Sequence, residues 1–206
     1  MTFNVLAPSD GLYNYQPGLL SKLLTRYLIQ PEIDTVLLIG PTMCGKTTML
    51  DELPHTIAER SIVKWDLGKV LEHIFGRKLL DERLLGRVRR IESEVVEHSR
   101  LMYQNPVIVK AVSGLNSTLR SRETANPAST ICIVTIGPPE GITGRLMAYA
   151  PYTAYHTSTE ATIAATLAET FALPKRNEKF AKIFYINTFG DEGIEWLSRR
   201  IEIKKT

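Results

Sequence analysis

The segment that most restricts the fold of this chain is Gly40-Pro-Thr-Met-Cys-Gly45-Lys46-Thr47, which matches the pattern G-x-x-x-x-G-K-[ST] at every required position. The five residues before it, Thr35 to Ile39, form a compact apolar run, as a buried parallel strand does, and helical character resumes after Thr47. A glycine turn between a strand and a helix directs successive backbone N–H groups toward an anion. The segment therefore predicts a phosphate-binding loop.

Every residue of this loop has an expected place around the phosphates of ATP or a related nucleotide. Gly40 and Gly45 permit the tight backbone path, and Lys46 offers an ammonium group to the β and γ phosphates. The Thr47 hydroxyl is an expected ligand of Mg²⁺. The other expected contacts to the nucleotide come from Pro41, Thr42, Met43, Cys44 and Thr48. An ordinary glycine turn is the alternative for the loop, and Cys44 is either a small filler or a redox switch.

Strands and helices alternate along the chain. Expected strands cover Thr35 to Ile39, Ser61 to Trp65, Val107 to Val112, Ile131 to Ile136 and Lys182 to Asn187. This alternation predicts a three-layer α/β/α sandwich with a mainly parallel, five-stranded sheet. Before the first strand, leucines at helical spacing between Leu19 and Leu28 predict an amphipathic helix, so residues 1–30 form an N-terminal extension packed on the core.

Composition narrows the setting of the protein. With 206 residues the chain has the size of one α/β domain, and no stretch approaches the roughly 18 apolar residues of a membrane span. The N-terminus lacks a signal pattern and the two cysteines are isolated in sequence, so we expect a cytoplasmic protein without a membrane partner. A net charge of +3 is compatible with a nucleic-acid partner but does not require one.

Three classes of nucleotide-binding protein compete for this pattern. A GTPase should contain D-x-x-G and N-K-x-D, and neither is present. An ATPase motor should end an apolar strand with adjacent acids, whereas the strands here end in Ser113-Gly114 and Gly137-Pro138. A phosphotransferase needs a carboxylate near the acceptor hydroxyl, and Asp66 directly follows the expected second strand. A helix N-cap is the alternative role for Asp66.

The chain resembles the P-loop kinases grouped around polynucleotide kinases, zeta toxins and gluconate kinases. The resemblance covers most of the chain and rests on GPTMCGKTT, IVKWD, VIVKAVSGLNSTLRSR, VTIGPPEGITGRLMAYA and ATLAETFALPKRNEKFAKIFYINT. It implies that residues 31–206 form a kinase-like domain with a lid around residues 145–178.

The resemblance also implies roles for individual residues. Asp66 would orient or deprotonate the acceptor hydroxyl, Arg145 would act in catalysis, and Arg120 and Arg122 would contact phosphates or acceptor. The third strand lacks the acid that polynucleotide kinases carry and is closer to the serine of gluconate kinases, here Ser113, so Mg²⁺ would rely on Thr47, Asp66 and water. The lid departs from the pattern as well, because it is poor in arginine.

These features lead to one expected function and one alternative. The expected function is an ATP- and Mg²⁺-dependent transfer of the γ-phosphoryl group to a hydroxyl acceptor, with a nucleic acid or nucleotide favoured over a sugar. The alternative is a P-loop ATPase or nucleotide-sensing module that acts on a protein partner. A degenerate domain that binds nucleotide without turnover is a third option.

Overall fold

Seven strands form one sheet, in the order β1-β7-β6-β2-β5-β4-β3. The computed structural model describes residues 11–75, 82–114, 116–149, 166 and 168–198. The strands are β1 (Gly11–Asn14), β2 (Thr35–Ile39), β3 (Thr56–Ile57), β4 (Arg60–Asp66), β5 (Val107–Ala111), β6 (Thr130–Ile136) and β7 (Lys182–Asn187). Every neighbouring pair is parallel except β3 with β4. The result is a mixed α/β structure whose parallel-dominated sheet fits a P-loop kinase-like fold.

The expected number of five strands was wrong, because short strands extend both edges of the sheet. β1 adds four residues beside β7, and β3 adds two residues beside β4 in an antiparallel hairpin. Neither segment carries the long β-branched run by which the other strands were found. Their pairing partners, rather than their own composition, make them strands.

The helices are α1 (Leu19–Tyr27), α2 (Lys46–Asp51), α3 (Leu67–Phe75), α4 (Glu82–Met102), α5 (Ser117–Glu123), α6 (Pro139–Tyr149) and α8 (Gly190–Ser198), with 3-10 turns at Pro127–Ser129 and Arg176–Glu178. No helix in the described part of the chain is long and apolar enough to cross a membrane. Residues 150–165 of the expected lid lie outside the described residues.

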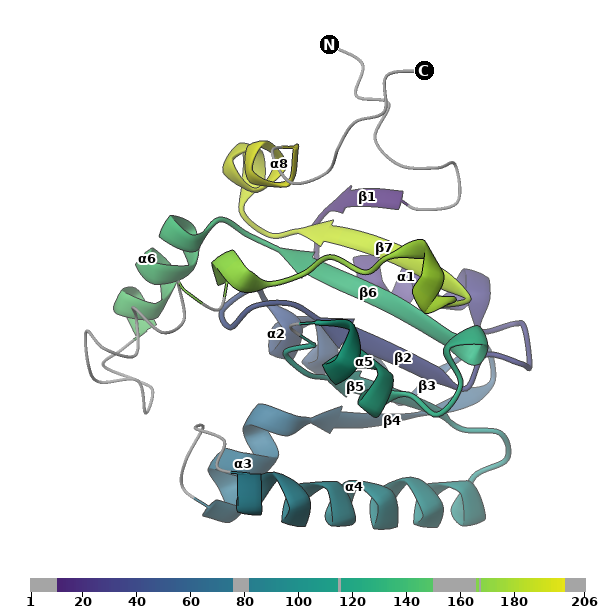
Figure 1. Cartoon of the computed structure of the whole chain (residues 1–206). Coiled ribbons are helices and arrows are strands. Elements are labelled where there is room, and N and C mark those ends of the chain that lie inside the picture. The colour runs from purple at the N-terminus through teal and green to yellow at the C-terminus, as the bar shows by residue number, and fades with distance from the viewer. Residues whose placement is uncertain (1–10, 76–81, 115, 150–165, 167, 199–206) are drawn as a thin grey trace.

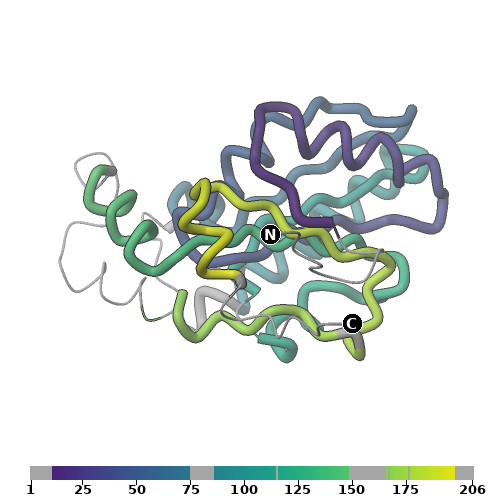
Figure 2. The backbone as a smooth tube through the Cα atoms, turned by 90° about the horizontal axis from the view of Figure 1, so that it is seen from above, coloured from purple at the N-terminus to yellow at the C-terminus, as the bar shows by residue number. Residues whose placement is uncertain are grey.

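Alternation along the central strand β2 divides the core between the two faces of the sheet. Val36 and Leu38 face a cluster that contains α1 and α2. Leu37 and Ile39 face a second cluster with Phe171 and residues of α8. Figure 2 shows α1 and the segment 168–181 on opposite sides of the sheet. The sheet is therefore covered on both faces.

The leucines expected in an amphipathic helix lie in α1, where Leu20, Leu23 and Leu24 are buried against the sheet. Each fully buried leucine contributes about 1.5–3 kcal/mol of transfer free energy. Residues 11–27 therefore belong to the same core and the same sheet as the rest of the chain.

The carboxyl ends of the strands gather the functional segments. The loop 40–45 follows β2, and α3, α6 and α8 begin directly or within a few residues after β4, β6 and β7 at the same edge of the sheet (Figure 1). The strand order changes direction at β2, with β5 on one side and β6 on the other. In open parallel sheets this is where ligands bind.

Candidate phosphate-binding site

The loop Gly40–Gly45 has the strained backbone of a tight anion-binding turn. Gly40 has φ +147° and passes so close to β6 that a Cβ atom there would lie 2.1 Å from Thr135 Oγ1. Its amide donates to the Ser113 carbonyl, 3.2 Å away, which fixes the loop to the end of β5. Gly45, at φ 82°, is the left-handed residue that starts α2. Both positions require glycine.

Lys46, the first residue of α2, folds back over the loop. Its ammonium group donates to the carbonyls of Gly40 and Pro41 at 2.8 and 2.6 Å. Burial lowers the pKa of Lys46, and the nearby carboxylate of Asp66 acts in the opposite direction. Both hydrogen-bond acceptors are neutral, so phosphate oxygens would be stronger partners for this cation.

Thr47 and Asp66 meet although they come from different elements. The Thr47 hydroxyl donates to Asp66 Oδ2 at 2.6 Å. The other oxygen, Oδ1, accepts from the Lys69 amide at 3.1 Å in the first turn of α3. Asp66 therefore caps α3, which is the alternative role considered for it, and its second carboxylate oxygen contacts the first turn of α2.

The remaining loop residues divide into lining and packing positions. Thr42 and Met43 are half-buried and Thr48 is exposed on α2, whereas Pro41 and Cys44 are buried. Cys44 packs against Ile142, Leu146 and Ala168. Burial raises the pKa of its thiol to about 11, so the reactive thiolate is scarce at neutral pH. These observations favour the filler role of Cys44 over the redox switch.

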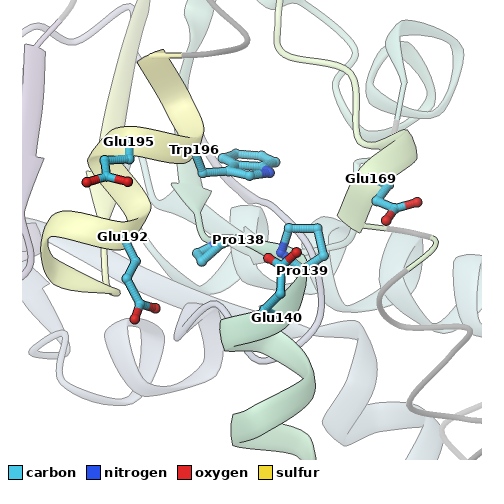
Figure 3. Close-up of a pocket in the computed structure, with 7 residues that line it drawn as sticks. All are labelled: Pro138, Pro139, Glu140, Glu169, Glu192, Glu195 and Trp196. Carbon is cyan, nitrogen blue, oxygen red and sulfur yellow. The ribbon is translucent and has the colours of Figure 1, made fainter.

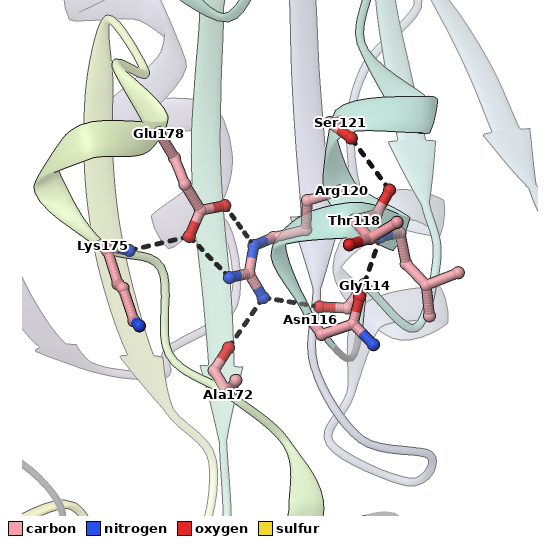
Figure 4. Close-up of polar contacts among 9 residues, drawn as sticks. Gly114, Asn116, Thr118, Arg120, Ser121, Ala172, Lys175 and Glu178 are labelled. Carbon is pink, nitrogen blue, oxygen red and sulfur yellow. Dashed lines mark hydrogen bonds and ion pairs between the residues drawn. The ribbon is translucent and has the colours of Figure 1, made fainter.

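Arg120 is part of a buried structural link. Its side chain is 1% exposed and pairs with Glu178 through two hydrogen bonds of 2.7 and 2.6 Å. The same guanidinium donates to the carbonyls of Gly114 and Ala172 (Figure 4). Four of its five donors are thus used inside the protein, and we leave Arg120 out of the ligand contacts proposed for this site.

The other predicted substrate-binding residues are placed differently. Ser113 is half-buried beside Gly40 at the carboxyl end of β5, so it lies next to the phosphate loop. Arg122 is exposed near the end of α5, away from the end at which that helix leaves β5. The structure therefore brings Ser113, but not Arg122, to the loop.

Arg145 projects from α6 onto the outer side of the phosphate loop. It donates to the Met43 carbonyl at 3.1 Å, to Thr188 Oγ1 at 3.2 Å and to the Thr188 carbonyl. Its guanidinium carbon lies 3.6 Å from the centre of the Phe189 ring. The sequence analysis missed Thr188 and Phe189; the signal that could have found them is their place directly after the last strand, at the ligand-binding edge of the sheet.

A separate hollow of about 400 Å³ lies at the same edge, between the starts of α6 and α8 (Figure 3). Four of its lining residues are glutamates, and the full set is Pro138, Pro139, Glu140, Glu169, Glu192, Glu195 and Trp196. Carboxylates repel the phosphates of a nucleotide. This hollow is therefore unfavourable for phosphate groups.

Comparisons with known proteins add little to this geometry. No family model matches the chain, and no curated protein matches its sequence. Among solved structures, a gluconokinase from Sinorhizobium meliloti 1021 is 14% identical, over 82% of this chain and 94% of that one, with a TM-score of 0.48. A likeness at this level supports no inference about activity.

Proposed function

We propose that this protein is a phosphotransferase that moves the γ-phosphoryl group of ATP to a hydroxyl acceptor with the help of Mg²⁺. The observation that carries the proposal is the contact of 2.6 Å between Thr47, at the start of the phosphate helix, and Asp66, at the end of β4. It joins a phosphate-binding loop to a carboxylate, and a transferase needs both at one point.

The nucleotide would be held mainly by the loop. The amides of Cys44 and Gly45 and the N-terminus of α2 would supply donors to the phosphate oxygens, and the Lys46 ammonium would exchange its two carbonyl acceptors for the β and γ phosphates. A half-buried cation with a lowered pKa gains from such an exchange, because an anion stabilises its charged form.

The residues present fit a magnesium ion. Thr47 and Asp66 offer two oxygen ligands 2.6 Å apart, and Mg²⁺ typically binds through one or two protein oxygens together with phosphates and water. The ion would neutralise charge on the β and γ phosphates. Asp51, further along α2, is paired with Lys69 at 2.7 Å and is not a competing ligand.

The transfer step needs a base, and Asp66 is the candidate. A free lone pair of its carboxylate would take the proton of the acceptor hydroxyl while the acceptor oxygen bonds to the γ phosphorus. The bond from that phosphorus to the β–γ bridging oxygen breaks, and ADP leaves. The Lys69 amide, bonded to Asp66 Oδ1, keeps the carboxylate oriented.

We further propose a nucleic acid or nucleotide as the acceptor, with Ser113 beside it. Six basic residues lie between Arg77 and Arg90, and of these Arg87 and Arg90 are exposed on the first half of α4. Contacts to a phosphate backbone weaken steeply with salt. Oligonucleotide binding that falls with ionic strength supports this acceptor, whereas no binding at low salt favours a small molecule.

The deciding experiment follows γ-labelled ATP with Mg²⁺ across oligonucleotides, nucleosides, nucleotides and sugars. Asp66→Asn should retain nucleotide affinity and lose at least about 100-fold in transfer, since the amide can accept from the Lys69 N–H through its oxygen and donate to the Thr47 hydroxyl, but cannot take a proton. Asp51→Asn, on α2, is the matched control, because Asp51 is paired with Lys69 and takes no part in the proposed step, and it should remain active. Label released only as free phosphate would instead indicate the ATPase or sensing module, and a fully active Asp66→Asn variant would remove Asp66 from the mechanism.

A further inference from the structure

Two carbonyl groups of the phosphate loop are held from outside by residues of other elements. Arg145 Nη1 donates to the Met43 carbonyl at 3.1 Å, and the Thr188 hydroxyl makes a long hydrogen bond of 3.5 Å to the Cys44 carbonyl. The two holders are themselves joined, because Arg145 also donates to Thr188 Oγ1 at 3.2 Å. Arg145 and Thr188 thus form one hydrogen-bonded unit beside the loop, which we call the Arg145–Thr188 pair.

The orientation of a carbonyl fixes the amide of the same peptide. In a trans peptide the C=O and N–H bonds point in opposite directions. Holding the carbonyls of Met43 and Cys44 outward therefore turns the amides of Cys44 and Gly45 toward the inside of the loop. Neither amide makes a hydrogen bond within the part of the chain that the structure describes, so both remain available to an anion.

The Arg145–Thr188 pair also stabilises the strained backbone of the loop at Met43. Met43 has φ 65°, a left-handed conformation that costs a residue other than glycine about 1–2 kcal/mol. Arg145 is kept over its target by the Phe189 ring, at 3.6 Å. One helical turn of α6 supplies both Arg145 and the apolar residues Ile142 and Leu146, which bury Cys44. The α6 helix thus braces the loop by packing and by hydrogen bonding.

We propose that Arg145 and Thr188 are positioning residues, which orient the amides of Cys44 and Gly45 for phosphate binding. This assignment replaces the catalytic role expected for Arg145 from the sequence. It rests on the proposed function only in that the anion is the phosphate chain of a nucleotide. A positioning role predicts that both residues affect the binding of every phosphate-bearing ligand, including one without a γ phosphate.

The test compares Thr188→Val, Arg145→Lys and Arg145→Gln with the wild-type protein by calorimetric titration of MgADP, MgATP and pyrophosphate. Each variant should raise the Kd of all three ligands by a similar factor, about tenfold for the loss of one or two hydrogen bonds. The KM for MgATP should rise by the same factor as the Kd, because the same phosphate contacts are weakened. Thr143→Val is the matched control, because Thr143 donates at 2.9 Å to Pro139 on α6 and not to the loop.

Each outcome decides between the alternatives. Variants with an unchanged Kd for ADP and reduced turnover would mean that Arg145 contacts the transferred group, and the positioning role would be wrong. If the wild-type protein binds pyrophosphate but not ATP, the proposed kinase function is refuted. The effect of the variants on the Kd of pyrophosphate then decides the positioning role. Binding of none of the three ligands would overturn both proposals. The melting temperature of ligand-free Thr188→Val should equal that of the wild-type protein. This control shows that a weaker Kd comes from the loop and not from unfolding.

Discussion

Lys46 and Arg120 are two cations at opposite faces of the sheet, and their partners differ. Among the described residues, the partners of Lys46 are two neutral carbonyls of its own loop, whereas Arg120 is neutralised by the Glu178 carboxylate and also donates to two carbonyls. A phosphate would be a stronger partner for Lys46 than the two carbonyls, but it would offer Arg120 no charge that Glu178 does not already supply. A cation with neutral partners is therefore the better candidate for a ligand contact than a cation that already has a carboxylate.

The most severe test of this contrast is the removal of Arg120. Arg120→Ala should lower the free energy of unfolding by about 3–5 kcal/mol, because it leaves Glu178 buried without its partner. Urea denaturation measures the loss. Combining Arg120→Met with Glu178→Leu should recover most of the stability, since the exchange removes both charges. An Arg120→Ala variant as stable as the wild type would contradict the structural role.

Removal of Lys46 should have the opposite profile. Lys46→Met should weaken ATP binding by about 100-fold through the loss of a charge-assisted contact, and should leave the free energy of unfolding unchanged or higher, because a poorly compensated cation is removed. Calorimetric titration and urea denaturation measure the two effects. Lys22→Met, on the exposed side of α1, is the matched control for both. A strongly destabilised Lys46→Met variant would erase the contrast with Arg120.

The contribution of Glu178 should depend on pH. Burial alone would raise the pKa of Glu178, but hydrogen bonds and positive charge from Arg120 and Lys175 outweigh it and lower the pKa below 4.5. A group whose pKa is lowered on folding stabilises the protein above its unfolded pKa and loses that contribution as the pH falls through the folded pKa. The stability difference between wild type and Glu178→Gln should thus be largest near neutral pH and shrink below about pH 4.5.

Denaturation series at several pH values test this dependence. Glu94→Gln, at an exposed position of α4, is the control and should show no comparable change. A difference between wild type and Glu178→Gln that stays constant down to pH 3 would argue against the Arg120–Glu178 pair as its source.

The smallest expected effect on stability concerns the C-terminal end of α2. Glu52, directly after α2, accepts from the Tyr15 hydroxyl and from the Gly18 amide. Burial and Glu52 raise the pKa of Tyr15 to about 12, so this bond persists below pH 10 and is lost as the pH rises through 12. Tyr15→Phe should lower stability by about 1 kcal/mol near neutral pH. Tyr103→Phe, at an exposed position after α4, is the control and should not change the melting temperature. Equal melting temperatures for the two variants would refute a stabilising role of the hydrogen bond between Tyr15 and Glu52.

The phosphate loop could be predicted because its information is local. The glycines, Lys46 and Thr47 lie within eight residues, and the strand and helix around them carry their own patterns. The position of Asp66 beside the loop could be predicted as well, because the end of a parallel strand defines one edge of the sheet whatever the exact strand order.

The partners of the arginines could not be predicted. Nothing near Arg120 indicates that its carboxylate comes from Glu178, 58 residues further on. The same is true of Arg145, whose contacts to Met43 and Thr188 join three separate parts of the chain. The short strand β1 was missed for a related reason, because its four residues become a strand only against β7.

The pairing of β1 with β7 has a consequence for co-translational folding. Gly11 lies beside Phe184, so β1 can pair only after β7 has been synthesised. Contacts between such distant residues are slow to form, because a long loop must close first. Until β7 is synthesised, β1 lacks its partner in the sheet and the apolar side of α1 lacks its contacts with that strand, so both are open to non-native contacts.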